Sequence, residues 1–179
     1  AINVTSSDRE KTKRIVYAVI YGVGPDKLAE TLGVSREEAR TFTKSFLSTF
    51  HGVGSFARTC ISCCQRHGFV QTIFRRRRLI PNINSSDFHI RSHAERQCVN
   101  FVVQGSAADV CKMAMIEVVH ALAARTQLKA RLLVQIHDEL LLEVADQDVE
   151  EVKDIVKSVM EVTEFRCGPH IQLQVCNYS

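Results

Sequence analysis

His137, Asp138 and Glu139 form the clearest cluster of ionisable side chains in the sequence. Short apolar runs flank them within Leu132 to Val144, which predicts a β-hairpin that carries the three groups at its tip. Adjacent carboxylates repel each other unless a cation lies between them, so metal-assisted chemistry is the first functional hypothesis. The alternative is a solvated turn between two strands.

A second candidate site lies on a predicted helix from about Ser7 to Tyr21, which ends at Gly22 and Gly24. Four of its side chains are spaced four residues apart and therefore form one stripe: Arg9, Lys13, Tyr17 and Tyr21. The cationic end of the stripe can hold a polyphosphate, and the aromatic end can stack on a base or a sugar. The alternative is a solvated helix face with two half-buried tyrosines.

A third candidate is a stripe of hydrogen-bond donors on a predicted helix from about Ile90 to Val103. Its members are Arg96, Asn100 and Gln104, again four residues apart. The minor groove of DNA presents acceptors at similar places for every base pair, so such donors would sense pair shape without reading sequence. Helix capping and interhelical hydrogen bonds are the alternative use of these side chains.

The remaining pattern is that of helices with a few strands. We expect helices at Pro25–Leu32, from the Ser35–Glu38 capping box to about Phe50, at Phe56–His67 and at Asp146–Val162, and strands at Phe69–Phe74 and Ile171–Val175. Residues 81–87 should form a loop. Gly52 and Gly54 should separate two helices, and Gly105–Ser106 should interrupt the donor helix before a further helix through Ala124.

Two local clusters have more than one interpretation. The run Arg75–Arg78 is either a solvated strand edge or a phosphate-contacting loop, with a nuclear-localisation signal as a weaker alternative. Cys60, Cys63, Cys64 and His67 share one helix face, as zinc ligands would, but one rigid helix cannot easily surround an ion tetrahedrally. Packing in the core is therefore the favoured role of these thiols.

The composition is that of an ordinary globular protein with one domain or two small lobes. The chain has 179 residues, 45% of them hydrophobic, and a net charge of +3. Its seven cysteines are odd in number and scattered, which predicts free thiols in a reducing compartment. With no apolar run of about 18 residues and no signal-like start, we expect no membrane association.

In this order, three motifs resemble those of family A DNA polymerases. The first is the stripe from Arg9 to Tyr21 with Gly22, the second runs from Ala94-Glu95-Arg96 to Gln104-Gly105-Ser106, and the third is Gln135-Ile136-His137-Asp138-Glu139-Leu140. The resemblance covers nearly the whole chain. It implies an α+β fold, with a helical fingers subdomain at about residues 1–92 and part of an antiparallel-sheet palm at 93–179, including a catalytic hairpin at 131–144.

The resemblance also implies a role for each candidate residue. Lys13 and Arg9 would hold the triphosphate, with Lys13 also assisting catalysis, while Tyr17 would stack on the nucleotide and Tyr21 would lie beside the templating base. Asp138 would bind Mg²⁺ in a two-metal site, supported by Glu139 and His137. Contacts to DNA would come from Arg96, Asn100, Gln104, His137, Arg76 and Arg77. The implied partners are primer–template DNA and deoxynucleoside triphosphates, and the implied setting is nuclear DNA replication, repair and translesion synthesis.

Departures from the family pattern set further expectations. The family has another catalytic aspartate in a strand upstream of the fingers, and this sequence starts too late to include it. We therefore expect these 179 residues alone not to extend a primer. A non-catalytic DNA-binding module is the alternative function, and a metal hydrolase built on Asp138 and Glu139 is weaker because it leaves the first stripe unexplained. Arg75 stands where the family usually has Gly, and Arg14, beside Lys13, is expected to add charge near the nascent base pair.

Overall fold

The computed structural model describes residues 5–137 and 139–167, with side chains described as far as Glu161. The chain forms two compact units that divide between Gln104 and Gly105. The assignment of residues 1–92 to fingers and 93–179 to palm stays a prediction. No helix among the described residues is long and apolar enough to cross a membrane.

Three helices at the start of the first unit pack around one leucine. They are α1 (Ser6–Ile20), α2 (Pro25–Leu32) and α3 (Arg36–Thr49). Leu28 of α2 is 1% exposed and packs with Ala18 of α1 and Ala39 of α3. Because the two alanines are small, the helices can approach closely around Leu28, and this packing fixes α1. The predicted bounds of all three helices are confirmed within one or two residues.

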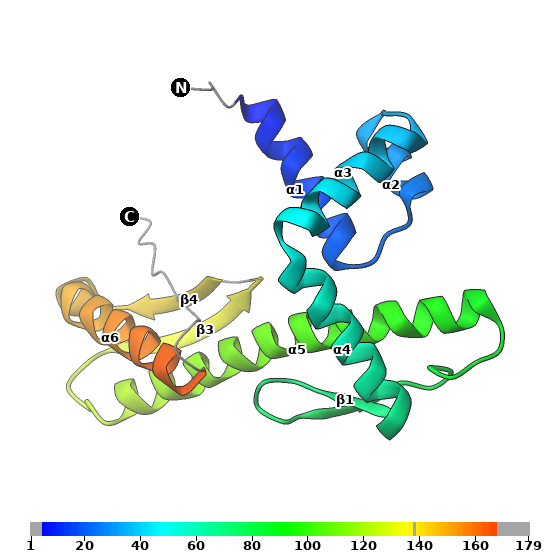
Figure 1. Cartoon of the computed structure of the whole chain (residues 1–179). Coiled ribbons are helices and arrows are strands. Elements are labelled where there is room, and N and C mark those ends of the chain that lie inside the picture. Colours follow the sequence, from blue (N-terminus) through cyan, green and yellow to red (C-terminus); the bar gives the residue numbers. More distant parts are fainter. Residues whose placement is uncertain (1–4, 138, 168–179) are drawn as a thin grey trace. The chain divides into compact units, whose positions relative to one another are not determined.

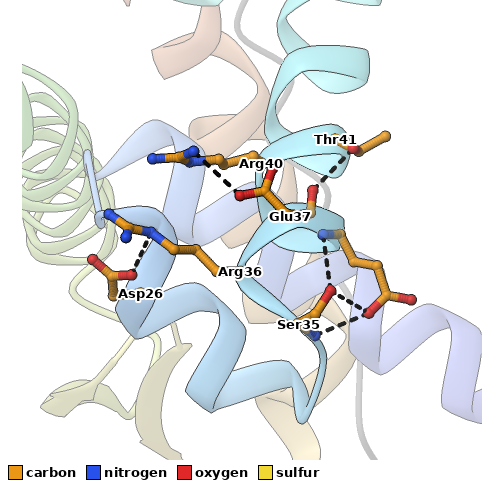
Figure 2. Close-up of polar contacts among 7 residues, drawn as sticks. Asp26, Ser35, Arg36, Glu37, Arg40 and Thr41 are labelled. Atoms are coloured by element: carbon orange, nitrogen blue, oxygen red, sulfur yellow. Dashed lines mark hydrogen bonds and ion pairs between the residues drawn. The ribbon is translucent and has the colours of Figure 1, made fainter.

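Polar contacts fix the connection between α2 and α3 (Figure 2). The predicted capping box is present: Ser35 Oγ accepts from the Glu38 backbone N–H at 3.2 Å, and Glu38 Oε2 accepts from the Ser35 N–H at 2.9 Å. The backbone bond from Ser35 is the main cause of a lowered pKa at Glu38. Arg36 Nε lies 2.7 Å from Asp26 Oδ1 and so ties the start of α3 to the start of α2.

Helix α4 (His51–His67) begins earlier than the sequence predicted. The break between α3 and α4 lies at Phe50, with φ −113° and ψ 59°, and the expected break at Gly52 and Gly54 was wrong. A Cβ added at Gly54 would lie 3.3 Å from Arg58 Nη1 and 3.6 Å from Leu47 Cδ2, and one added at Gly52 would meet nothing within 4 Å. Neither glycine forms a turn, and both lie within the first turns of α4.

A short antiparallel hairpin follows α4. Strand β1 (Phe69–Gln71) pairs with β2 (Arg77–Leu79), with Phe69 opposite Leu79. The predicted strand at Phe69–Phe74 is therefore shorter, and the solvated strand edge, one of the uses predicted for Arg75–Arg78, is seen for Arg77 and Arg78 in β2. Residues 81–87 form the predicted loop without helix or strand. The core beneath the hairpin joins α4, β1 and α5 through Cys64, Val70, Ile80, Ala94 and Cys98.

Helix α5 (Phe88–Ala123) runs unbroken through 36 residues (Figure 1). The expected interruption at Gly105–Ser106 was wrong, because a single interior glycine costs only about 1 kcal/mol relative to alanine and the flanking residues favour helix. The start of α5 is fixed by Asp87, whose Oδ1 accepts from the backbone N–H of His89 at 2.7 Å and of Ile90 at 3.1 Å. These two bonds lower the pKa of Asp87, with the bond from Ile90 the largest cause.

The second unit contains the C-terminal half of α5, a hairpin and the last helix. Strand β3 (Ala130–Ile136) pairs with β4 (Glu139–Val144), and a 3₁₀ turn (Asp146–Asp148) leads into α6 (Val149–Cys167). Val118 and Leu122 of α5 pack against Val152 and Ile155 of α6. The predicted hairpin and the α+β class are confirmed. The strand expected at Ile171–Val175 lies outside the described residues.

Candidate functional site

The first predicted stripe lies on α1, whose start is held by a capping box. Thr5 Oγ1 accepts from the Asp8 N–H at 3.2 Å, and Asp8 Oδ2 accepts from the Thr5 N–H at 3.0 Å. The Thr5 hydroxyl, which also donates to this carboxylate, is the largest cause of the lowered pKa of Asp8. The predicted start of this helix at about Ser7 did not include the cap at Thr5.

One side of α1 forms a shallow hollow of about 410 Å³ that is widely open to solvent. It is lined by Arg9, Thr12, Lys13, Val16 and Tyr17. Tyr17 is 53% exposed, and its ring stacks on Tyr21 with 6.1 Å between centroids and 12° between planes. Lys13 Nζ lies 3.8 Å from Glu10, but both side chains are more than half exposed, so this ion pair is weak. The hollow therefore offers cations at one end and a flat aromatic surface at the other.

Arg14, predicted to add charge near the nascent base pair, contacts α2 and does not line the hollow. Its Nη1 donates to the Thr31 carbonyl at 3.3 Å, in the last turn of α2. A cation at a helix C-terminus is stabilised by the carbonyl groups that lack intrahelical partners. This contact gives Arg14 a structural use in joining α1 to α2.

The end of α1 lies against the donor stripe of α5. Gly22 has φ +67°, and a Cβ added there would lie 3.2 Å from Arg96 Cγ. Arg96 in turn donates from Nη1 to Ser92 Oγ at 2.8 Å. The structure thus brings Arg96 next to the Tyr21–Gly22 end of the first stripe, a contact that residue spacing along the chain does not reveal.

The other two donors follow Arg96 along α5. Asn100 is half-buried, and its Oδ1 has no hydrogen-bond partner within the described part of the chain, whereas Gln104 is exposed. A buried amide oxygen without a partner is costly unless a ligand or water satisfies it. This observation favours a binding role for Asn100 over a purely structural one.

The predicted DNA contacts Arg76 and Arg77 lie in the β1–β2 hairpin, which is built around Arg75. The Arg75 N–H donates to the Thr72 carbonyl at 2.9 Å, and the Thr72 N–H donates to the Arg76 carbonyl at 3.0 Å. Arg75 itself has φ 63°. A turn followed by a residue in the left-handed region is a common three-residue hairpin loop, and it favours glycine at that residue. The loop explains why the family usually has Gly where this chain has Arg75.

Replacing Arg75 with Gly is expected to raise the free energy of unfolding by about 1 kcal/mol, because a side chain in the left-handed region costs about 1–2 kcal/mol. For a chain of this size the melting temperature should rise by about 2–4 °C. Urea unfolding followed by circular dichroism measures the difference. Arg75→Ala is the control: it removes the same charge but keeps a Cβ, so an equal gain in both variants would contradict the backbone explanation.

The predicted catalytic hairpin is formed by β3 and β4 of the second unit. Ile136 pairs with Glu139, His137 has φ 54°, and Gln135 Nε2 donates to the His137 carbonyl at 2.8 Å. His137 and Glu139 are exposed, and Asp138 lies outside the described residues. Carboxylate oxygens are the ligands that Mg²⁺ prefers, so the chemistry of Glu139 and its neighbour Asp138 fits this ion.

The cysteines near α4 belong to the core. Cys64 and Cys98 are fully buried together, and burial raises the pKa of Cys98 to about 12. Such a thiol is a poor nucleophile at neutral pH. Within residues 5–137 and 139–167, no three or more His, Cys, Asp or Glu side chains are placed to hold a metal ion together.

Known proteins match nearly the whole chain, including the three motifs. The profile of DNA polymerase family A matches residues 1–177. DNA polymerase I of Lactococcus lactis subsp. lactis (strain IL1403) is 38% identical over 161 residues, 90% of this chain and 18% of that protein. DNA polymerase I of Bacillus subtilis (strain 168) is 40% identical over 158 residues, 88% of this chain. The chain thus spans less than a fifth of the length of these relatives.

A solved structure also matches. The POL domain of Pol1 from M. smegmatis, in complex with DNA primer-template and dNTP, has a TM-score of 0.86 and 35% identity, covering 90% of this chain and 28% of that one. The similarity therefore includes the three-dimensional arrangement as well as the motifs.

A finer assignment within the family has less support. From three segments the sequence predicts a member most similar to vertebrate DNA polymerase nu, with polymerase theta next: Tyr21-Gly22-Val23-Gly24, Phe101-Val102-Val103-Gln104 and Cys111-Lys112-Met113-Ala114. The comparisons include DNA polymerase theta of Mus musculus, 36% identical over 185 residues and covering 86% of this chain and 7% of that protein, and they do not single out polymerase nu. What they establish is the family: the chain belongs to DNA polymerase family A.

Proposed function

We propose that this chain forms the nucleotide-binding and primer–template-binding part of a template-directed DNA polymerase, which transfers deoxynucleotides to a primer 3′ end. The observation that carries the proposal is the hollow on α1 lined by Arg9, Lys13 and Tyr17. Membership of the family supports it, as does the similarity to a polymerase bound to DNA primer-template and dNTP. Because the chain spans 18% of its bacterial relatives, the activity of those whole proteins is part of the proposal.

The α1 hollow suits an incoming deoxynucleoside triphosphate. Lys13 and Arg9 lie one helical turn apart and would hold the phosphates, offsetting the charge that develops on them as pyrophosphate leaves. Tyr17 stacks on Tyr21 and presents an exposed ring on which the nucleotide can rest. With its remaining exposed surface, Tyr21 would lie beside the templating base.

The hairpin of the second unit would hold the metal. Asp138 would bind Mg²⁺, with Glu139 and His137 supporting the site and the primer end. When bound, Mg²⁺ supplies charge that activates the primer 3′ hydroxyl and stabilises the leaving phosphates. The chain's own contribution is the turn, which Gln135 holds through the His137 carbonyl.

Primer–template DNA would lie along the donor stripe of α5. Arg96, Asn100 and Gln104 would donate to minor-groove acceptors, Asn100 through its amide Nδ2, while its unpartnered Oδ1 would accept a hydrogen bond from a ligand or water. Arg76 and Arg77 would add contacts to phosphates. We also propose action in the nucleus, in repair and translesion synthesis, supported by the resemblance to vertebrate members of the family. Imaging of the tagged chain in cells tests the location.

Replacing Lys13 with Ala is expected to weaken binding of a deoxynucleoside triphosphate about 10- to 100-fold, because a hydrogen bond to a charged group contributes about 1.5–3 kcal/mol. The measurement is titration of the 179-residue chain with a fluorescent deoxynucleoside triphosphate. Lys11→Ala is the matched control, since Lys11 is an exposed lysine of α1 that does not line the hollow. Its affinity should stay within twofold of the unchanged chain.

Equal effects of the two lysine variants would contradict the proposed nucleotide site. Binding of primer–template without any binding of the triphosphate would favour the alternative, a DNA-binding module without catalysis.

A further inference from the structure

Arginines of the β1–β2 hairpin lie over aromatic rings of the first unit. The guanidinium carbons of Arg76 and Arg78 lie 5.1 and 5.4 Å from the centroid of the Phe101 ring in α5. Arg77 lies 4.7 Å from the ring of Phe69 in β1. These are cation–π distances. One phenylalanine of α5 thus supports two arginines, and a second phenylalanine supports the arginine between them.

The strand register explains this alternation. Val70 is opposite Arg78, so both point to the face that packs on the core, while Arg77 is opposite Gln71 on the other face. Val70 is buried and Arg78 is exposed. The stem of Arg78 can therefore cover apolar surface around Phe101 while its charged end remains in water.

The hairpin has no compensating negative charge in its own sequence. Residues 68–86 contain four arginines and no Asp or Glu. Arg77 and Arg78 make no ion pair with any residue of the described part of the chain. The guanidinium groups of Arg77 and Arg78 rest on rings and so have lost side-chain freedom before any ligand arrives, and their N–H edges remain available for phosphate oxygens.

Spacing and position indicate the kind of anion. Residues two apart in an extended strand are separated by about 6.6 Å, so Arg76 and Arg78 can meet neighbouring phosphates of one nucleic-acid strand. Phe101 directly follows Asn100 and is turned about 100° from it around α5. The arginines therefore flank the donor stripe of Arg96, Asn100 and Gln104 on the same segment of helix.

We propose that Phe101 and Phe69 hold Arg76, Arg77 and Arg78 in place as a preorganised site for the sugar–phosphate backbone that borders the minor groove of the primer–template duplex. This inference rests on the proposed function. It assigns a role to Arg78 and makes Phe101 a positioning residue, which acts through the arginines and need not touch DNA.

The test measures binding of a fluorescent blunt DNA duplex to the 179-residue chain at several salt concentrations. Phe101→Leu keeps an apolar side chain and all the arginines, so it should weaken binding about three- to tenfold while leaving the salt dependence unchanged. Arg78→Gln removes one phosphate contact and should reduce the slope of log affinity against log salt by about 0.9. Phe56→Leu is the control: Phe56 is an exposed phenylalanine for which no arginine contact is seen in the described structure, and affinity should not change.

Arg78→Lys covers the case in which Phe101→Leu fails to fold, as judged by circular dichroism. Lysine keeps the charge but lacks the flat guanidinium group, so affinity should fall with the slope retained. Unchanged duplex affinity in both Arg78 variants would overturn the inference, as would losses seen only with single-stranded DNA. Those results would not contradict the proposed function if Lys13→Ala still weakens nucleotide binding. The proposed function itself would be contradicted if the unchanged chain bound neither DNA nor the nucleotide.

Discussion

Replacing Leu28 with Ala is expected to lower the free energy of unfolding by about 2–5 kcal/mol, the range for buried leucines. Leu28 is 1% exposed and packs between Ala18 of α1 and Ala39 of α3. Ala18 and Ala39 are too small to fill the cavity that the change would leave, although Ile15, Leu32 and Val34 at the edge of the cluster can move partly into it. Domains of this size are stable by only about 5–15 kcal/mol, so the loss is a large fraction of the total.

The loss should also reach the proposed nucleotide site, because Leu28 is the most deeply buried contact of α2 with α1 and α3. Urea unfolding gives the stability, and titration with a fluorescent deoxynucleoside triphosphate gives the affinity under native conditions. Leu79→Ala is the matched control: Leu79 is 76% exposed in β2, and surface changes usually alter stability by less than about 0.5 kcal/mol. Similar losses in the two variants would show that the three-helix core does not depend on Leu28.

Local patterns predicted most of the helices because their signals lie within a few residues. Ser35 and Glu38 predicted the start of α3, and the structure contains both hydrogen bonds of that capping box. Glycines were wrongly taken as the ends of helices at two places, inside α4 and inside α5. Gly52 and Gly54 lie inside α4, and α5 continues through residue 105, since neighbouring turns compensate for one unfavourable residue.

In the candidate site, too, features within one helix were predictable from the sequence and contacts between elements were not. The α1 stripe was predicted from spacing alone, because residues four apart in one helix must share a face. Contacts between elements were not predictable: the approach of Gly22 to Arg96, and the support of Arg76 and Arg78 by Phe101, depend on how separate segments pack. Arg78 and Phe101 are 23 residues apart in the sequence, and no periodic pattern indicates that they lie in contact.

Replacing Gly22 with Val is expected to lower the free energy of unfolding by about 2–4 kcal/mol and to displace Arg96. Two costs add. Gly22 has φ +67°, a conformation in which a β-branched residue is strained by about 1–3 kcal/mol, and its new Cβ would lie only 3.2 Å from Arg96 Cγ. Moving that methylene group would shift a predicted DNA contact, so binding of a fluorescent primer–template should also weaken.

Gly33→Val separates the two costs. Gly33 has φ +66°, almost the same as Gly22, but an added Cβ there meets nothing within 4 Å. It should therefore show the backbone strain alone, about 1–3 kcal/mol, with DNA affinity retained. A loss of DNA affinity confined to Gly22→Val would assign the effect to Arg96. Equal DNA affinity in the two variants would mean that the position of Arg96 beside Gly22 does not matter for binding, and that Gly22 serves only the turn at the end of α1.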